Sequence, residues 1–377
     1  MSPSPSIKRL VIHAGDPKTG SSSIQQVLFD GAWSAPGSSL AYPGVLNAIP
    51  LADALRGELP PPRARRQIAQ SAEWLAAQTA DVAVFSAEHF AFVEPDTLRE
   101  ALPRLLGETG RQVTVLAYVR PHLPRLLSTF AQRVKTRGLE LDFEAFCRKT
   151  VAGRQFHYAP RFLGWRGVFG EGFVLRAMTR GELFRGDVVA DFLQAVLGSE
   201  DVTVHATAAV NESPTLDHLA ALSLVQSGLK AAGIERVLRH ALCTALAQRL
   251  GQIPRDRAGP RPGIPAALLP WLQEAYRADA EALDTAFFPG RSPLGDELER
   301  ARGVEEDQSI RPEARLAPEV RAGLTRAAQG LAAALAADPT SWLRQFRQKN
   351  RRHGQVEESA GALAVDGLLD EAAALLG

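Results

Sequence analysis

A polar segment near the N-terminus, residues 17–24, carries the residue types that bind an anion. It reads Pro-Lys-Thr-Gly-Ser-Ser-Ser-Ile and lies between an apolar run at 10–12 and a helix-like stretch. A glycine at such a turn lets the backbone approach a ligand closely, and the first N–H groups of a helix point outward at the positive end of its dipole. Lys18 adds a cation, and the three serines add hydroxyl donors. The segment therefore predicts a cradle for a phosphate or sulfate ester.

The order of residues in this cradle differs from that of an ordinary nucleotide-binding loop. The Walker pattern places Lys and then Ser or Thr directly after its second glycine. Gly15 and Gly20 have the right separation, but Ser21 stands at the lysine position and Lys18 precedes the glycine. This displacement disfavours an ordinary ATPase or kinase. The order of residues 17–23 instead resembles the 5'-phosphosulfate loop of sulfotransferases that use 3'-phosphoadenosine-5'-phosphosulfate (PAPS).

A second pair of residues supports this resemblance. The apolar, β-branched run 113–119 predicts a buried parallel strand that ends at Arg120, and Ser128 follows inside a helix-like stretch. Sulfotransferases place an arginine and a serine at this separation to hold the 3'-phosphate of PAPS, and a guanidinium fork fits a phosphate dianion well. The resemblance thus implies that one set of residues binds PAPS: Lys18, Thr19, Gly20, Ser21, Ser22, Ser23, Arg120 and Ser128.

Weaker likenesses to bacterial sulfotransferases recur in order along the chain. They are the segments 42–44, 85–90, 191–193, 210–213 and 287–289, so the likeness covers about residues 8 to 290. The resemblance implies two catalytic roles. Lys18 would stabilise the charge that grows on the leaving bridge oxygen. Glu88 or His89 would take the proton of an acceptor hydroxyl.

Glu88 and His89 compete for the role of base. Neighbours in a strand face opposite ways, so both cannot reach one spot if the strand continues. The Ser-x-Glu arrangement at 86–88 resembles the bacterial enzymes and favours Glu88. A helix-capping glutamate beside a buried histidine is the alternative without catalysis. Lys18 as an exposed loop lysine and Ser21–Ser23 as helix N-cap residues are the corresponding alternatives in the cradle.

Other polar residues carry weaker signals, and each has a structural explanation. His13 lies in the first expected strand and is interpreted as a packed strand residue. Asn211 and Ser213 approach the cofactor by family analogy, but a turn before Pro214 explains them equally well. No His/Cys/Asp cluster has metal-ligand spacing, so we expect no metal cofactor. The arginines of one Pro- and Gly-rich stretch are interpreted as a solvated loop rather than as contacts for an anionic acceptor: Arg255, Arg257 and Arg261.

The elements expected around these residues form a doubly wound α/β fold. Alternating strand-like and helix-like patterns predict a parallel sheet covered on both faces, with ligands at the C-terminal strand ends. From Pro214 onward the pattern is helical. The expected strands lie near 8–14, 82–86, 112–119 and 172–178, and the helices near 21–30, 64–79, 121–137 and 187–197.

The predicted domain organisation has three parts. Residues 1–290 form the sulfotransferase-like α/β domain, whose helical second half begins at about 214. A linker follows at 291–312, where charges and turn residues replace apolar periodicity. Residues 313–377 form a helical extension with no family match, for which we consider capping of the core and self-association.

Bulk composition limits the classes of partner. The chain has 377 residues, of which 45% are hydrophobic, and 43 Lys plus Arg against 42 Asp plus Glu. This near-zero balance gives no reason to expect nucleic-acid binding. No apolar stretch approaches the roughly 18 residues of a membrane span, and the first residues lack the apolar core of a signal peptide. We therefore expect a cytoplasmic protein whose partner is a small-molecule or glycan acceptor.

Three functions are compatible with these observations. The first is transfer of a sulfuryl group from PAPS to a hydroxyl, less readily an amine, of a carbohydrate, lipid or small metabolite. The second is an NTP-dependent kinase or nucleotide hydrolase with an irregular phosphate loop, in which Glu88 would hold Mg²⁺. The third is a non-catalytic partner-binding protein on the same fold. The ordered set of Lys18–Ser23, Glu88, Arg120 and Ser128 favours the first.

Overall fold

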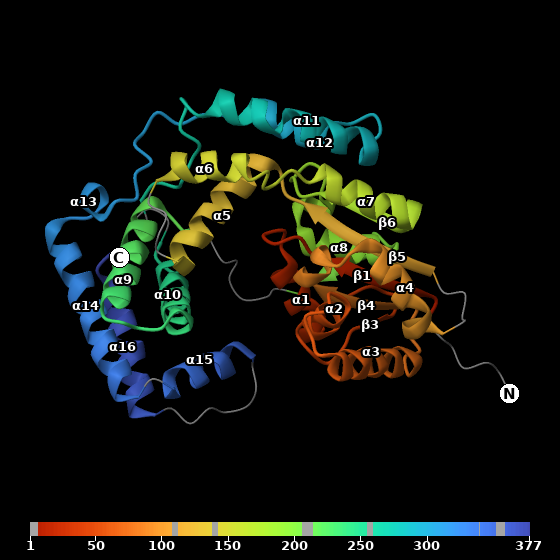
Figure 1. The fold of residues 1–377 in the computed structure, drawn as a ribbon, viewed down its shortest axis with the longest axis horizontal. Helices are drawn as coiled ribbons and strands as arrows, with labels where there is room; N and C mark the ends of the chain where they lie inside the picture. The colour runs from red at the N-terminus through yellow and green to blue at the C-terminus, as the bar shows by residue number, and fades with distance from the viewer. Residues whose placement is uncertain are drawn as a thin grey trace. The chain divides into compact units, whose positions relative to one another are not determined.

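The fold is given by a computed structural model that describes residues 7–107, 112–137, 142–205, 214–254, 259–338, 340–351 and 359–377. The chain divides into two compact units (Figure 1). Unit 1 comprises Met1–His122, His157–Ala208 and Gln273–Arg300. Unit 2 comprises Leu123–Phe156, Ala209–Leu272 and Ala301–Gly377.

Unit 1 is built on a five-stranded parallel sheet with the strand order β3-β4-β1-β5-β6 (Figure 1). The four strands predicted from the sequence are confirmed to within one residue at each end. The short edge strand β3 was not predicted, because two residues carry no periodicity. The strands of this sheet are β1 (Arg9–Ala14), β3 (Leu40–Ala41), β4 (Val82–Ala87), β5 (Gln112–Val119) and β6 (Phe173–Ala177). A separate antiparallel pair joins β2 (Trp33–Ser34) to β7 (Thr203–Val204).

Helices cover both faces of the sheet, as predicted. On one face, α1 (Ser21–Asp30) and α8 (Val188–Leu197) share a buried apolar cluster with strand side chains such as Val11 and Tyr118. On the other face, α3 (Pro61–Ala76) places the ring of Trp74 beside that of Phe85, with 5.2 Å between the ring centroids. Helix α7 (Ala159–Phe169) stacks Phe162 on Phe173, with 6.0 Å between the ring centroids. Helix α4 (Pro95–Leu106) packs between α3 and α7. Helix α3 begins before the expected residue 64, because prolines fit the first turn of a helix.

Helix α7 is anchored at its N-terminus by a buried carboxylate. Asp279, on α11 (Leu269–Phe287), accepts hydrogen bonds from the N–H groups of Tyr158 and Ala159, both at 2.9 Å. The same carboxylate contacts His122 Nε2 at 2.9 Å. Burial opposes ionisation of Asp279, but these hydrogen bonds outweigh it and lower the pKa of the carboxyl group. The start of α7 is therefore fixed relative to α11.

The predicted linker at 291–312 requires a correction in its first part. Residues Pro293–Arg300 form helix α12, which belongs to unit 1. Asp284 caps this helix by accepting the N–H groups of Leu294 and Gly295 at 3.1 and 2.8 Å. The cap comes from ten residues away on α11, and the helix is only eight residues long. Local sequence reasoning therefore missed the helix.

Unit 2 is helical, as the sequence pattern from Pro214 predicts. Its core joins α9 and α10 to α14 and α16, so residues 313–377 are not a separate extension but share one apolar core with the helices before them. The backbones of α9 and α14 approach closely, because a Cβ on Gly228 would lie 2.9 Å from that of Ala328. The helices are α5 (His122–Arg137), α6 (Phe143–Ala152), α9 (Leu216–Ala231), α10 (Arg236–Leu250), α13 (Pro312–Arg315), α14 (Pro318–Ala337), α15 (Ser341–Arg351) and α16 (Ala360–Ala374).

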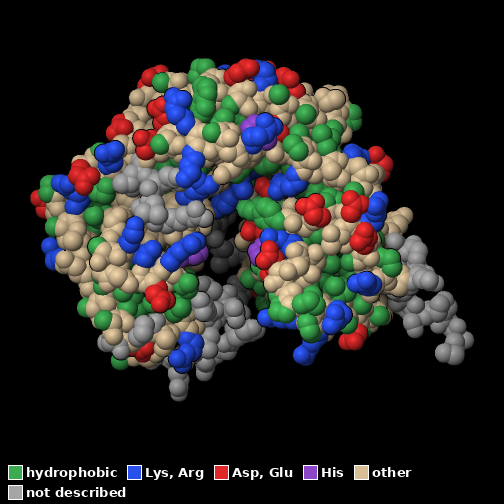
Figure 2. Space-filling model, viewed as in Figure 1, with side chains coloured by type: hydrophobic (Ala, Val, Ile, Leu, Met, Phe, Trp, Pro, Cys, Tyr) green, Lys and Arg blue, Asp and Glu red, His purple; other side chains and the backbone are tan. Residues whose placement is uncertain are grey.

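The surface of each unit mixes both signs of charge. Figure 2 shows Lys, Arg, Asp and Glu side chains interspersed over the visible face of both units, in keeping with the balanced composition. Cys147 and Cys243 are buried free thiols. Within the described ranges, no helix is both long and apolar enough to cross a membrane.

Candidate functional site

The strand order reverses between β1 and β5. From β1 the chain passes to β3 on one side of the sheet, and from β5 it passes to β6 on the other. In open α/β sheets, ligands bind outside the C-terminal strand ends at such a reversal. The cradle follows β1 and Arg120 follows β5, so the topology brings both to this point. Arg120 Nη1 donates a hydrogen bond to the carbonyl oxygen of Lys18 at 3.2 Å.

The backbone of the cradle is wound by two residues in the left-handed region. Lys18 has φ of 71° and Gly20, the N-cap of α1, has φ of 80°. Such a conformation is uncommon for a residue with a side chain, and it clusters at functional sites. The helix's own bonding begins with the N–H groups of Ser23 and Ile24, which both donate to Gly20 O. The N–H groups of Ser21 and Ser22 thus lie outside the ladder of α1, where a helix receives an anion.

The three cradle serines differ in where their hydroxyls lie. Ser21 is 2% exposed, and its Oγ has no hydrogen-bond partner among the described residues. This hydroxyl lies inside the loop, because a Cβ built on Gly15 would collide with it. Ser22 and Ser23 are exposed on the first turn of α1. A buried hydroxyl without a partner marks Ser21 as the serine best placed to donate to a ligand.

A carboxylate lies in the same loop. Asp16 is 2% exposed, and its Oδ1 accepts from Arg161 Nη2 on α7 at 2.6 Å. Its carbonyl oxygen accepts both the N–H and the hydroxyl of Thr19, at 3.3 and 2.5 Å. The sequence analysis assigned no role to Asp16 or Arg161. No spacing rule could have found the pair, because tertiary packing alone brings α7 to the loop.

A buried polar network lies beneath the cradle. His13 is fully buried on β1, as predicted for a strand residue, and its Nδ1 lies 2.8 Å from Ser86 Oγ on the neighbouring strand β4. Gln25 of α1 also donates to Ser86 Oγ at 3.1 Å. Burial lowers the pKa of His13 to about 3, so its imidazole is neutral at physiological pH. The ring packs against Phe192 at 5.0 Å between centroids.

The buried network reaches the floor of the cradle. The Cε1 atom of His13 lies 3.4 Å from where a Cβ on Gly15 would stand. Nearby in the fold, Tyr42 Oη donates to Leu46 O at 2.8 Å, because a carbonyl oxygen can only accept.

Glu88 and His89 lie at the end of β4, beside the cradle. Ala87, the last residue of β4, pairs in register with Ala14, the last residue of β1. Glu88 and Gly15 are therefore the first residues beyond these two neighbouring strand ends. The strand stops there, because residues Glu88–Phe92 form the 3₁₀ helix η1. The side chains of Glu88 and His89 would face opposite ways only in a continuing strand, and β4 does not continue through them. Both are half-buried.

His89 has a partner that the sequence did not suggest. Its Nδ1 lies 2.6 Å from Oδ1 of Asp53 on α2 (Ile49–Leu55), and Arg56 contacts the same oxygen at 3.4 Å. The His89 side chain is 37% exposed, which corrects the alternative of a buried histidine. A carboxylate on Nδ1 holds the tautomer in which Nε2 can accept a proton.

The remaining predicted residues are less informative. Ser128 is a half-buried residue of α5 and belongs to unit 2, whereas Arg120 belongs to unit 1. That the two residues together bind the 3'-phosphate stays a prediction. Arg261 is exposed, in keeping with a solvated loop. Asn211, Ser213, Arg255 and Arg257 lie outside the described residues. In the described part of the chain, no three His, Cys, Asp or Glu side chains lie close enough to hold a metal ion.

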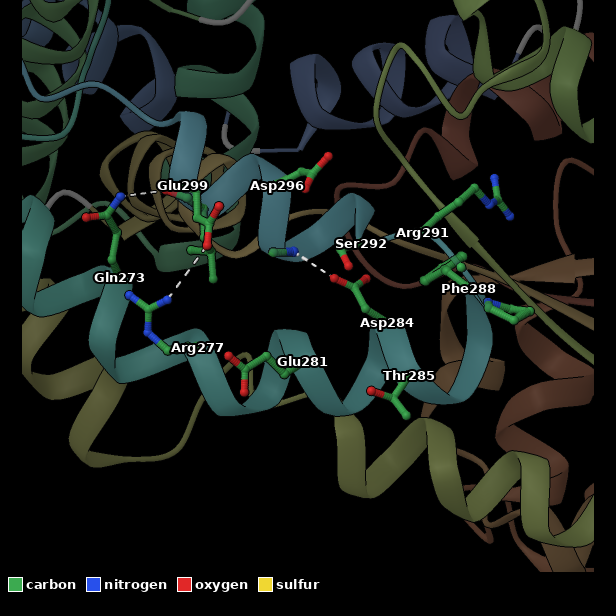
Figure 3. Close-up of a pocket in the computed structure, with 14 residues that line it drawn as sticks. Gln273, Arg277, Glu281, Asp284, Thr285, Phe288, Arg291, Ser292, Asp296 and Glu299 are labelled. Carbon is green, nitrogen blue, oxygen red and sulfur yellow. Dashed lines mark hydrogen bonds and ion pairs between the residues drawn. The ribbon is translucent and has the colours of Figure 1, made fainter.

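A groove of about 810 Å³ lies elsewhere in unit 1, between α11 and α12 (Figure 3). Several of its polar groups are already engaged. Asp284 caps α12, Gln273 donates to Leu298 O at 2.6 Å, and Arg277 lies 3.9 Å from Glu299. These contacts hold the two helices together. The groove is therefore interpreted as the seam of a helical hairpin rather than as the site of the cradle chemistry.

Comparisons with protein-family models, with curated proteins and with solved structures find no match to this chain. The likeness to sulfotransferases therefore depends on its own residues and on the geometry described above.

Proposed function

We propose that this protein is a PAPS-dependent sulfotransferase that acts on a hydroxyl group. One observation carries the proposal: Arg120 meets the cradle loop of Lys18 at the point where the strand order reverses. Two anion-binding features from distant parts of the sequence thus lie at one sheet edge. A ligand with anionic groups at two positions, such as the 5'-phosphosulfate and 3'-phosphate of PAPS, suits such a pair.

The residues of the cradle fit the 5'-phosphosulfate. The buried Ser21 hydroxyl and the first N–H groups of α1 supply donors without a partner in the helix, and Lys18 supplies a cation. Gly20 is required twice, by its left-handed φ and because a Cβ there would lie 2.7 Å from Val188. Arg120 is assigned to the 3'-phosphate, together with Ser128. PAPS supplies the activated sulfuryl group.

The proposed reaction is an in-line displacement. A bond forms between the acceptor oxygen and sulfur as the bond from sulfur to the bridge oxygen breaks, and adenosine 3',5'-bisphosphate leaves. Lys18 stabilises the charge that grows on the bridge oxygen. The proton of the acceptor hydroxyl passes to a base at the end of β4.

Glu88 is the proposed base, and His89 is its competitor. The resemblance of residues 86–88 to the bacterial enzymes supports Glu88. The contact of His89 with Asp53 supports the competitor, because it leaves Nε2 as the accepting nitrogen. Both lie on η1, directly beyond the strand that pairs with β1. Variants of each residue, described in the Discussion, distinguish them.

Ligand binding by the intact protein tests the proposal. Isothermal titration calorimetry with adenosine 3',5'-bisphosphate should give a saturable site, and binding of ATP with Mg²⁺ should be weaker. Incubation with sulfur-labelled PAPS and a panel of carbohydrate, lipid and small-metabolite acceptors should then label at least one acceptor. Stronger binding of Mg²⁺-ATP would favour a kinase or nucleotide hydrolase. Absence of binding to either nucleotide would favour a non-catalytic protein.

The wider setting belongs to the same proposal. We infer a cytoplasmic enzyme supplied with PAPS, with a small-molecule or glycan acceptor and no metal requirement. Self-association through residues 313–377 is a further part of this inference. Sedimentation velocity of the full chain over a range of protein concentrations would test it, because self-association raises the sedimentation coefficient with concentration.

A further inference from the structure

The loop proposed to bind an anion also contains a carboxylate, that of Asp16. Asp16 stands between Gly15 and Pro17, in the loop whose lysine, glycine and serines select a negative ligand. Its side chain is 3% exposed. A buried carboxylate is costly unless it is paired, and here Arg161 pairs with it at 2.6 Å. The loop therefore holds a negative charge and a guanidinium together.

Arg161 is only partly used by this contact. Its Nη2 donates to Asp16, while its Nε is buried and has no hydrogen-bond partner among the described residues. The guanidinium carbon lies 4.6 Å from the centroid of the Phe162 ring, and the Arg161 side chain is 27% exposed. A guanidinium carries five donors in a planar fork that matches two oxygens of a phosphate or sulfate. Arg161 is thus a positioned fork with donor capacity left over.

The position of Asp16 couples this pair to the shape of the cradle. The Asp16 carbonyl accepts both hydrogen bonds from Thr19 that close the loop. Lys18 lies between Asp16 and Thr19 in the sequence, and its carbonyl oxygen accepts a hydrogen bond from Arg120. The Asp16 carboxylate and the two arginines are therefore tied to one turn of backbone.

We propose that Arg161 is a further anion-binding residue of the cradle and that Asp16 is an internal anion that the ligand displaces from it. This inference depends on the proposed function in one respect, which is that the cradle binds a phosphate or sulfate ester. Asp16 weakens binding of every anion by charge repulsion, so only a ligand that replaces its contact to Arg161 binds well. The same repulsion speeds release of the anionic product.

Two substitutions of this one ion pair are expected to act in opposite directions. Asp16→Asn should tighten binding of adenosine 3',5'-bisphosphate and of inorganic pyrophosphate by about tenfold, because a like charge near the anion is removed. Arg161→Gln should weaken binding of both by about tenfold or more. Affinities would be measured by calorimetry at one low ionic strength. An ion pair that serves only to hold α7 on the loop would weaken binding in both variants, and that result would overturn the proposal.

A matched control lies on the same helix. Arg166→Gln removes the same charge from α7, but Arg166 contacts the exposed Glu171 at 2.6 Å and not the cradle. Its affinity for both ligands should stay within about twofold of the wild type. An equal loss of affinity in Arg166→Gln and Arg161→Gln would show that only the net charge of the protein matters, and it would contradict the proposal.

A second measurement does not depend on the folding of a variant. Phenylglyoxal modifies exposed guanidinium groups, and peptide mass spectrometry of the wild type reports each arginine separately. Bound bisphosphate should protect Arg161 and leave Arg166 unprotected. Binding of the bisphosphate without protection of Arg161 overturns this inference alone. Failure of the wild type and of Asp16→Asn to bind either ligand overturns the proposed function together with it.

Discussion

The guanidinium of Arg120 donates to the carbonyl oxygen of Lys18 across 102 residues of sequence. One residue thus has two tasks in the proposed site, to hold the shape of the cradle and to bind the 3'-phosphate. The two tasks can be separated by the choice of ligand, because inorganic pyrophosphate has no 3'-phosphate.

Arg120→Ala should weaken binding of adenosine 3',5'-bisphosphate by roughly 1.5–3 kcal/mol, the usual loss for a charged hydrogen bond. It should also erase discrimination against an analogue without the 3'-phosphate. Calorimetry with the two nucleotides measures both quantities. Retained discrimination would place the 3'-phosphate elsewhere, and a parallel loss of pyrophosphate affinity would show that Arg120 acts by shaping the cradle.

Lys18→Ala should lower turnover far more than affinity, because the proposed contact strengthens as the bridge oxygen gains charge. Lys18→Gly is the matched variant, since glycine adopts the left-handed φ of 71° without strain. Both variants lack the amine and should be equally slow, while Lys18→Gly should unfold at the higher temperature. Turnover and thermal unfolding would be measured side by side. A defect confined to affinity would contradict the catalytic role.

Glu88→Gln removes a proton acceptor and keeps its shape, so the rate should fall by roughly 10²–10⁴-fold while cofactor binding survives. His89→Ala should then be the milder change. Steady-state rates and bisphosphate affinity would be compared for both variants.

Asp53→Asn provides the control for that comparison. If His89 were the base, its imidazole without the Asp53 carboxylate would no longer be held in the tautomer with an accepting Nε2, and the rate would fall. With Glu88 as base, the rate should stay unchanged. An inactive His89→Ala that still folds and binds the bisphosphate, together with an active Glu88→Gln, would reverse the assignment.

His13 should make the folded protein sensitive to acid. Burial lowers its pKa from 6.5 to about 3, so between these values the unfolded chain binds the proton and the folded protein does not. Stability is therefore complete above about pH 6.5 and falls as the pH drops toward 3. Between pH 7 and pH 5 the loss from this one group is roughly 2 kcal/mol.

Urea unfolding of the wild type and of His13→Gln at pH 7 and pH 5 measures this contribution. The two proteins share every other titrating group, so the difference between their pH slopes isolates His13. The variant should lose less stability on acidification, whatever its absolute stability at pH 7. Equal losses in both proteins would show that His13 accepts a proton in the folded state.

Sequence alone determined the periodic part of this protein. Runs such as 113–119 and the stretches 21–30 and 187–197 carry a clear apolar pattern, so four of the five strands of the sheet and the helices α1, α5 and α8 could be predicted to within one residue. Helix α3 begins and ends three residues earlier than expected, and α4 and α7, which also cover the sheet, were not predicted. The tight turn from β1 into α1 could also be anticipated, because a glycine between a strand and a helix has a local backbone reason, and the binding of an anion there stays a prediction.

Only the tertiary structure decided which side chains meet there. Asp16 and Arg161 are 145 residues apart, and Asp53 and His89 are 36 apart, and neither pair has a spacing that a helix or strand imposes. Strand order brings Arg120 to Lys18, and Asp284 caps α12 from another helix. Periodicity reports which face of an element is buried, because burial depends on the local alternation of apolar residues. It contains no information on which distant element covers that face, because that choice depends on packing across the whole unit.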